Sequence, residues 1–169
     1  MSTAALLFVG ATCSVLVARR ALSETREGQQ QTFPVDEARD LKGRVVPLLG
    51  RKEPTIVMIN SRTCPWCKKS LTDIGRIAAG RPLPRLTVVT LEGAAAATPM
   101  LALEKITGAT LLGPARTAAE LQRALGHTGT PIFVAVDANG RVIRAMPGYP
   151  IYEEMKRWVA VMAGDENSP

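Results

Sequence analysis

Hydrophobic residues along this chain form two kinds of pattern, and each kind predicts a different element. Two uninterrupted apolar runs rich in β-branched residues, at 55–60 (TIVMIN) and 86–91 (LTVVTL), are typical of strands buried on both faces. Between them, apolar residues at helical spacing predict a helix from residue 64 or 65 to about residue 79. A strand, a helix and a strand in this order predict a βαβ unit with a parallel strand pair.

Two further helices are expected on either side of this unit. Upstream, Asp36 is a suitable N-cap for a helix over 37–49, whose apolar residues lie roughly on one face. Downstream, Thr98 followed by Pro99 is typical of a helix start and predicts a helix over 100–106.

The rest of the chain predicts a break, a helix, a hairpin and a last helix. The break is expected at 108–114 and the next helix at 115–125. An apolar run at 132–136 (IFVAV), the turn sequence DANG and a segment at 141–145 (RVIRA) that pairs back predict the hairpin. An amphipathic helix is expected over 151–162. Together these elements predict an α/β fold with a central mixed four-stranded sheet flanked by helices, and with a helical insertion before the strand at 132.

The N-terminal residues 4–18 are uncharged and almost wholly apolar. This stretch is shorter than the usual membrane span of about 20 residues, but Arg19 and Arg20 can snorkel and lengthen it. We expect an uncleaved membrane anchor, with a cleaved signal and a buried helix as alternatives. By the positive-inside rule the two arginines would favour a cytoplasmic domain. The redox chemistry of the cysteines, described below, favours a domain on the other side of the membrane. The expected division is an anchor or signal at 1–20, a linker at 21–35, a domain at 36–164 and a tail at 165–169.

Composition narrows the function classes. With 169 residues the chain is long enough for one domain with its own core, and 46% hydrophobic but only 4% aromatic residues indicate an aliphatic core. The formal net charge is +6, but the basic residues are scattered and no aromatic residues alternate with them. We therefore expect no nucleic-acid partner.

Cysteine chemistry is concentrated at Cys64-Pro65-Trp66-Cys67, directly after the first buried strand and at the start of a helix. The unpaired N–H groups of a helix N-terminus stabilise a thiolate, so the pattern predicts that Cys64 attacks a disulfide and Cys67 resolves the mixed disulfide. The alternative is half of a zinc site, but a tetrahedral site needs four ligands and the only other candidates are Cys13, His127 and carboxylates. We expect neither a metal nor a cofactor.

Thr130-Pro131 is the second candidate feature. A proline after Gly129 that opens a buried strand predicts a cis peptide bond beside the dithiol, with the backbone of Thr130 free to pair with an extended substrate. The alternative is a trans proline at the start of an edge strand.

These features together resemble the thioredoxin fold. Residues 128–158 are similar to the catalytic domain of the bacterial periplasmic disulfide isomerases of the DsbC/DsbG type, which also have threonine before the cis-proline and a PGY loop, here 147–149. The resemblance spans about 36–163. It does not extend to the dimerisation domain of those isomerases, since only an anchor, a linker and one helix precede the dithiol strand. Met58 stands where thioredoxin has a buried acid, six residues before its first cysteine.

The resemblance implies a thiol–disulfide oxidoreductase or isomerase that exchanges disulfides with protein substrates. It implies a periplasmic domain, tethered to the inner membrane or released by signal cleavage, and a membrane redox partner that resets the dithiol. The direction of electron flow and the oligomeric state stay open. Alternatives are a dedicated reductase for one partner in cytochrome maturation or in secretion or conjugation assembly, and a redox-inert scaffold. The expected active-site surface consists of Pro65, Trp66, Thr130, Pro131 and Tyr149.

Overall fold

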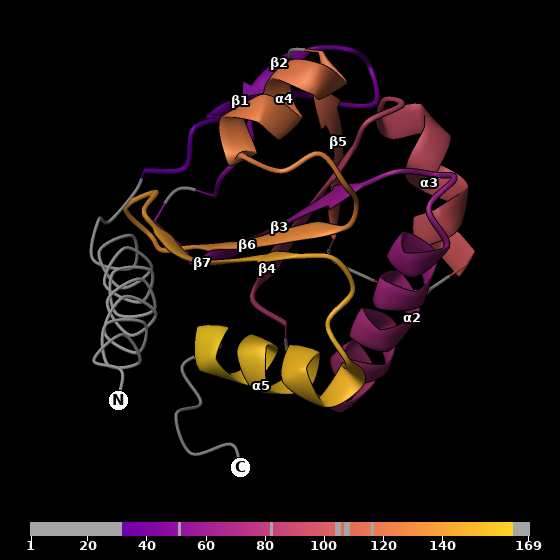
Figure 1. The fold of residues 1–169 in the computed structure, drawn as a ribbon, viewed down its shortest axis with the longest axis vertical. Helices are drawn as coiled ribbons and strands as arrows, with labels where there is room; N and C mark the ends of the chain where they lie inside the picture. The colour runs from indigo at the N-terminus through magenta and orange to yellow at the C-terminus, as the bar shows by residue number, and fades with distance from the viewer. Residues whose placement is uncertain are drawn as a thin grey trace, which may run out of the picture. The chain divides into compact units, whose positions relative to one another are not determined.

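The computed structural model describes residues 32–50, 52–81, 83–103, 106, 109–115 and 117–163 (Figure 1). The expected anchor at 1–20, with Cys13, most of the expected linker and the tail at 165–169 lie outside these residues. Within the described ranges, no helix combines the length and the apolar character that a membrane crossing requires.

The described residues form a seven-stranded mixed sheet in the order β2-β1-β5-β4-β3-β6-β7. Strand β3 lies inside the sheet, parallel to β4 and antiparallel to β6, and β7 pairs antiparallel with β6. These four strands are the ones that the sequence predicts, with the predicted directions. The strands are β1 (Glu37–Arg39), β2 (Val45–Pro47), β3 (Thr55–Asn60), β4 (Arg85–Thr90), β5 (Thr110–Pro114), β6 (Ile132–Val136) and β7 (Val142–Pro147).

Helices cover both faces of the sheet, with α5 on one side and α4 on the other (Figure 1). Met58 of β3 packs into a cluster with residues of α2 and α5, whereas its neighbour Ile59 packs with Leu121 of α4. Side chains of β3 therefore alternate between two apolar layers, which explains its uninterrupted apolar sequence. The described helices are α2 (Pro65–Gly80), α3 (Ala94–Leu103), α4 (Ala118–Leu125) and α5 (Tyr152–Met162).

The predicted helix over 37–49 is wrong, because these residues form the hairpin of β1 and β2. The side chain of Asp40 accepts hydrogen bonds from the backbone N–H groups of Lys42 and Arg44, and Gly43 has a φ of 77° that a helix does not allow. Strand β1 also pairs with β5, which lies far along the chain. This long-range pairing overrides a weak local helical pattern.

The predicted break at 108–114 is also wrong, since it contains β5, which pairs with both β4 and β1. The helix before it begins at Ala94 and not near residue 100, so Pro99 lies inside α3 and the hydroxyl of Thr98 bonds to the carbonyl of Ala94 within the helix. The next helix begins at Ala118, after a capping box formed by Thr117 and Glu120.

The strand register gathers the candidate residues at one edge of the sheet. Ile59, near the end of β3, faces Ile132 at the start of β6, and Ile132 faces Pro147 at the end of β7. The segments that follow β3, precede β6 and follow β7 therefore meet at this edge. They carry the dithiol, Thr130-Pro131 and Tyr149, respectively.

Candidate active site

The dithiol lies at the N-terminus of α2. Cys64 is the N-cap residue with extended backbone, Pro65 occupies the first turn, and the N–H of Cys67 donates to Sγ of Cys64 over 3.2 Å. Both cysteines are free thiols, Cys64 half-buried and Cys67 with 0% of its surface exposed. The N-cap position aims the helix N–H groups at the sulfur of Cys64, as the sequence pattern predicts.

Thr130 and Pro131 lie directly beside Cys64. The thiol of Cys64 donates to the backbone carbonyl of Thr130 over 3.3 Å, although 66 residues separate the two in sequence. The Thr130–Pro131 peptide bond is cis, so that prediction is confirmed. The carbonyl of Pro131 accepts from the N–H of Gly148 over 2.8 Å, which joins this segment to the PGY loop.

The two thiols have opposite pKa shifts. Burial opposes ionisation of Cys64, but hydrogen bonds from the Cys67 thiol, from the side chain of Thr130 and from the N–H groups of Cys67 and Trp66 outweigh it and lower the pKa of Cys64. Burial raises the pKa of Cys67 to about 12, and its hydrogen bond to Cys64 adds to this rise. The geometry thus stabilises a thiolate at the more accessible sulfur and a neutral thiol at the buried one.

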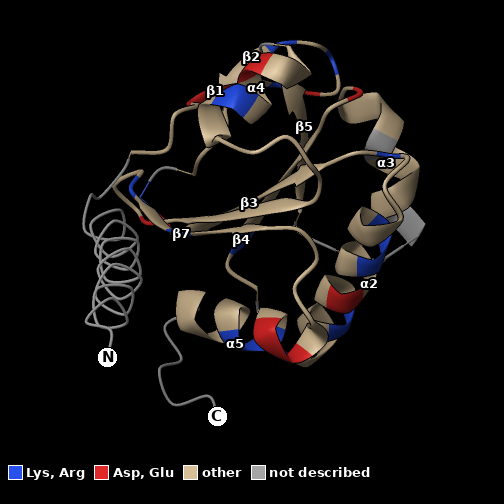
Figure 2. Ribbon diagram, in the orientation of Figure 1, with Lys and Arg blue, Asp and Glu red and all other residues tan. Residues whose placement is uncertain are grey.

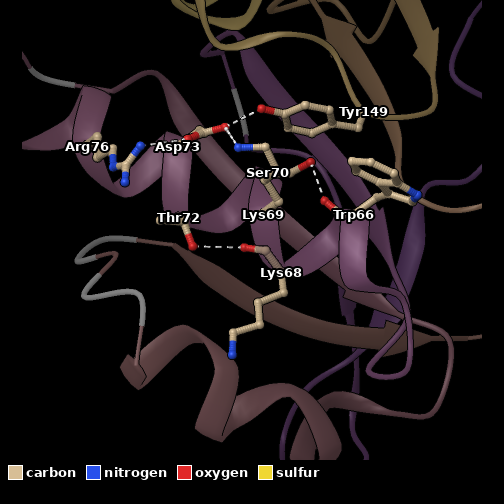
Figure 3. Close-up of polar contacts among 8 residues, drawn as sticks. All are labelled: Trp66, Lys68, Lys69, Ser70, Thr72, Asp73, Arg76 and Tyr149. Atoms are coloured by element: carbon tan, nitrogen blue, oxygen red, sulfur yellow. Dashed lines mark hydrogen bonds and ion pairs between the residues drawn. The ribbon is translucent and has the colours of Figure 1, made fainter.

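Two aromatic rings form the surface next to the dithiol. Trp66, with 55% of its surface exposed, stacks on Tyr149 with ring centroids 5.6 Å apart. The hydroxyl of Tyr149 donates to the carboxylate of Asp73 over 2.5 Å, and Lys69 lies over the Tyr149 ring (Figure 3). The PGY loop is thereby attached to α2.

A second carboxylate, that of Glu92, supports the turn between β3 and α2. Glu92 follows β4 and accepts hydrogen bonds from the hydroxyl of Ser61 over 2.5 Å, from the N–H of Arg62 over 3.1 Å and from the hydroxyl of Thr90 over 2.9 Å. Burial opposes its ionisation, but these bonds outweigh that effect and lower its pKa. The turn that holds Cys64 is therefore fixed by a residue 30 positions away.

A family model described as a thioredoxin-like domain matches residues 42–163, most of the chain. The chain belongs to the thioredoxin-like family. No curated protein matches this thioredoxin-like chain.

Solved structures share the thioredoxin-like fold with this chain at low sequence identity. DsbF of Mycobacterium tuberculosis is 22% identical, with a TM-score of 0.58 over 77% of this chain and 96% of its own. A thiol:disulfide interchange protein from Bacteroides is 19% identical, with a TM-score of 0.58 over 77% of this chain and 89% of its own. A peroxiredoxin-like protein from Aquifex aeolicus is 16% identical, with a TM-score of 0.62 over 79% of this chain and 86% of its own. At these identities the likeness establishes the fold alone.

The structure brings together all seven residues that the sequence singled out. The thiols and the cis peptide bond form the centre of the site, Trp66 and Tyr149 border it, and Pro65 is exposed in the first turn of the helix.

Three polar residues of this thioredoxin-like site were not predicted. Asp73 lies seven residues after Trp66 on the same helix, and Glu92 follows the strand parallel to β3, so helical spacing and the shared strand edge were available signals. Asn60 ends β3 and is fully buried, and its side chain makes no hydrogen bond within the described part of the chain. A polar residue that ends an apolar strand is the signal that could have identified Asn60.

Replacing Glu92 by glutamine tests how the turn is held. Because a hydrogen bond to a charged group contributes about 1.5–3 kcal/mol, we expect the free energy of unfolding at pH 7 to fall by about 1–2 kcal/mol. The pKa of Glu92 is lowered from its ordinary 4.5, so its stabilisation is present above pH 4.5 and is lost as the pH falls through the folded-state pKa. Urea unfolding of wild type and Glu92→Gln from pH 7 to pH 3 should show the difference shrinking in acid.

The matched control is Glu37→Gln, since Glu37 on β1 is exposed like Glu92 but its carboxylate has no hydrogen bond or ion pair within the described residues. It should leave the unfolding free energy within about 0.5 kcal/mol of wild type. A difference between Glu92→Gln and wild type that persisted unchanged at pH 3 would show that the charge of Glu92 does not hold the turn.

Proposed function

We propose that this chain is a thiol–disulfide oxidoreductase that exchanges disulfides with protein substrates through Cys64 and Cys67. The observation that carries the proposal is the asymmetry of the two thiols. Cys64 is half-buried at a helix N-terminus with a lowered pKa, while Cys67 is buried with its pKa raised to about 12. Stepwise disulfide exchange needs a first thiol that ionises readily and a second thiol that keeps its proton until the mixed disulfide has formed.

The reaction proceeds in two balanced steps. The Cys64 thiolate attacks one sulfur of a substrate disulfide, the substrate S–S bond breaks, and the other substrate sulfur leaves as a thiolate that takes up a proton. Cys67 then loses its proton and attacks the sulfur of Cys64, which forms the Cys64–Cys67 disulfide and releases the second substrate thiol. The substrate gains two electrons from the dithiol, and the two protons it takes up balance the ones that Cys64 and Cys67 lose to solvent. The reverse sequence donates a disulfide.

The substrate class we propose is a polypeptide. The exposed Trp66 and the half-buried Tyr149 and Thr130 present an aromatic and polar surface beside the sulfur of Cys64. Such a surface suits an extended chain more than a small thiol. The similarity of the chain's end to the DsbC/DsbG catalytic domain supports disulfide isomerisation within this class.

The proposed compartment is the periplasm, with the domain tethered to the inner membrane or released after signal cleavage, and with a membrane redox partner that resets the dithiol. This part of the proposal rests on the apolar stretch at 4–18 and on the proposed substrates, since stable protein disulfides persist mainly in oxidising compartments. Thiol labelling in intact cells tests it. Failure of a membrane-impermeant reagent to reach Cys64 would contradict the periplasmic placement.

Equilibration of the dithiol with defined thiol–disulfide buffers tests the proposed activity and its direction. A potential near about −270 mV would identify a dedicated reductase, and one near about −120 mV an oxidant. Recovery of native pairing from a scrambled disulfide protein, faster than oxidation of the same protein in its reduced form, would identify an isomerase. A dithiol that exchanges with none of these substrates would contradict the proposal and leave the redox-inert scaffold.

A further inference from the structure

Asp73 is a buried carboxylate outside the dithiol. Only 1% of its surface is exposed, and its carboxylate meets three donors: the hydroxyl of Tyr149 at 2.5 Å, Arg76 at 3.4 Å and Lys69 at 3.7 Å. A buried charge is costly unless it is paired and hydrogen-bonded, and here both conditions are met. Asp73 is the one acidic residue in the sequence of α2, which also carries Lys68, Lys69 and Arg76. Figure 2 shows both acidic and basic positions along this helix.

The contacts of Asp73 continue to the surface beside the dithiol. Trp66, Lys69 and Asp73 are spaced three and four residues apart, so they share one side of α2. Tyr149 lies against this side, with its hydroxyl on Asp73 and its ring stacked on Trp66 (Figure 3). The carboxylate therefore fixes the distal end of the Tyr149 ring, and the ring in turn supports one face of Trp66.

The same tyrosine is connected to the segment that contacts Cys64. Gly148, with a φ of 84°, donates its N–H to the carbonyl of Pro131, and Thr130 accepts the thiol of Cys64. The residue before Tyr149 is thus held by the Pro131 segment, and the hydroxyl of Tyr149 is held by Asp73 of α2. These two attachments fix the Tyr149 ring, and with it the stacked pair of Trp66 and Tyr149 beside the dithiol. We call this pair the Trp66–Tyr149 wall.

We propose that Asp73 is a positioning residue that sets substrate preference: by holding Tyr149 it keeps the Trp66–Tyr149 wall in place, and the wall selects polypeptides with an aromatic or large apolar side chain next to the reacting cysteine. This inference rests on the proposed oxidoreductase function. Asp73 acts through Tyr149 and not on sulfur. A stacked, anchored aromatic pair loses little conformational entropy on binding and can accept a further ring by stacking.

The test uses the reduced full-length chain and two peptide–glutathione mixed disulfides. The peptides differ only at the two residues that flank their cysteine, which are tryptophan in one and serine in the other. Each reaction converts the enzyme dithiol to its disulfide and releases peptide thiol and glutathione, so atoms and electrons balance. The ratio of the two second-order rate constants reports the preference. The dependence of each observed rate on peptide concentration separates apparent affinity from the maximal rate.

We expect wild type to prefer the tryptophan peptide by about 3- to 10-fold, the range that a single aromatic contact provides. In Asp73→Asn and in Tyr149→Phe, which keeps the ring but lacks the hydroxyl, the ratio should fall below about 2, mainly through weaker apparent affinity. Asp40→Asn is the matched control, since Asp40 pairs with Arg44 in the β1–β2 hairpin, and should keep the wild-type ratio. If Asp73→Asn fails to fold, the ratio measured for Tyr149→Phe alone tests whether the Asp73–Tyr149 hydrogen bond sets the preference.

The outcomes separate the two proposals. Equal wild-type rates with both peptides, or an unchanged ratio in Asp73→Asn and Tyr149→Phe, would overturn the positioning role while leaving the oxidoreductase function standing. Exchange with neither peptide would overturn the oxidoreductase function itself.

Discussion

Replacing Cys64 by serine is expected to abolish disulfide exchange, while replacing Cys67 by serine should leave the first step and trap the substrate. Cys64 is the sulfur that the helix N–H groups and Thr130 contact, so its loss removes the nucleophile. Removal of a catalytic nucleophile costs up to about 10⁶-fold in turnover, which would reduce the rate to the uncatalysed level. In Cys67→Ser the mixed disulfide forms on Cys64 but lacks the thiol that resolves it.

The measurement is turnover with a disulfide-containing protein, followed by non-reducing electrophoresis. Cys67→Ser should give a covalent adduct that thiol reductants release, and the double variant Cys64→Ser, Cys67→Ser should give none. Cys13→Ser is the control that distinguishes the dithiol from the chain's third cysteine, and it should keep wild-type turnover. Residual turnover in Cys64→Ser close to that of wild type would contradict the assignment of the nucleophile.

Alkylation with iodoacetamide at pH 7 is expected to modify Cys64 and to leave Cys67 unmodified. The pKa of Cys67 is about 12, so at pH 7 only about one molecule in 10⁵ carries its thiolate. The lowered pKa of Cys64 provides far more thiolate there. We expect Cys64 to react on the order of 10² times faster or more, after allowing for the higher intrinsic nucleophilicity of a high-pKa thiolate.

The pH dependence of alkylation tests the direction of each pKa shift, downward for Cys64 and upward for Cys67. Labelling of Cys64 should rise with a midpoint below its ordinary 9.0, and labelling of Cys67 in Cys64→Ser should begin only well above pH 9. The raised pKa of Cys67 also means that its stabilisation of the reduced fold is present below pH 9 and is lost as the pH rises toward about 12. Mass spectrometry of peptides after timed alkylation would contradict this ordering if Cys67 were labelled first.

The candidate site was largely predictable because its signals are local. Strand β3 is an uninterrupted apolar run, and Cys64 and Pro65 follow it with the sequence of a helix start, so the position of the dithiol depends on adjacent residues. Thr130-Pro131 could be assigned because a proline at the start of a buried strand has few conformations open to it.

The hydrogen-bond partners of the carboxylates near the dithiol were not predictable in this way. Glu92 follows β4 and accepts a hydrogen bond from Ser61 after β3, and Asp73 of α2 accepts one from Tyr149 after β7. Which carboxylate meets which donor depends on strand register and helix orientation, and neither is encoded within one segment.

The pattern along the chain thus sufficed for the central βαβ unit, the C-terminal hairpin, the last helix and the dithiol, because apolar periodicity and helix capping act over a few neighbouring residues. It failed for 37–49 and 108–114, where weak or helix-like local preferences gave way to pairing of β1 with β5 and of β5 with β4. Long-range pairing supplied the hydrogen-bond partners and the burial that these short strands lack alone. The same assembly split the two thiols' pKa values, since burial and the contacts of Cys64 and Cys67 exist only once β3, α2 and the Thr130 segment meet.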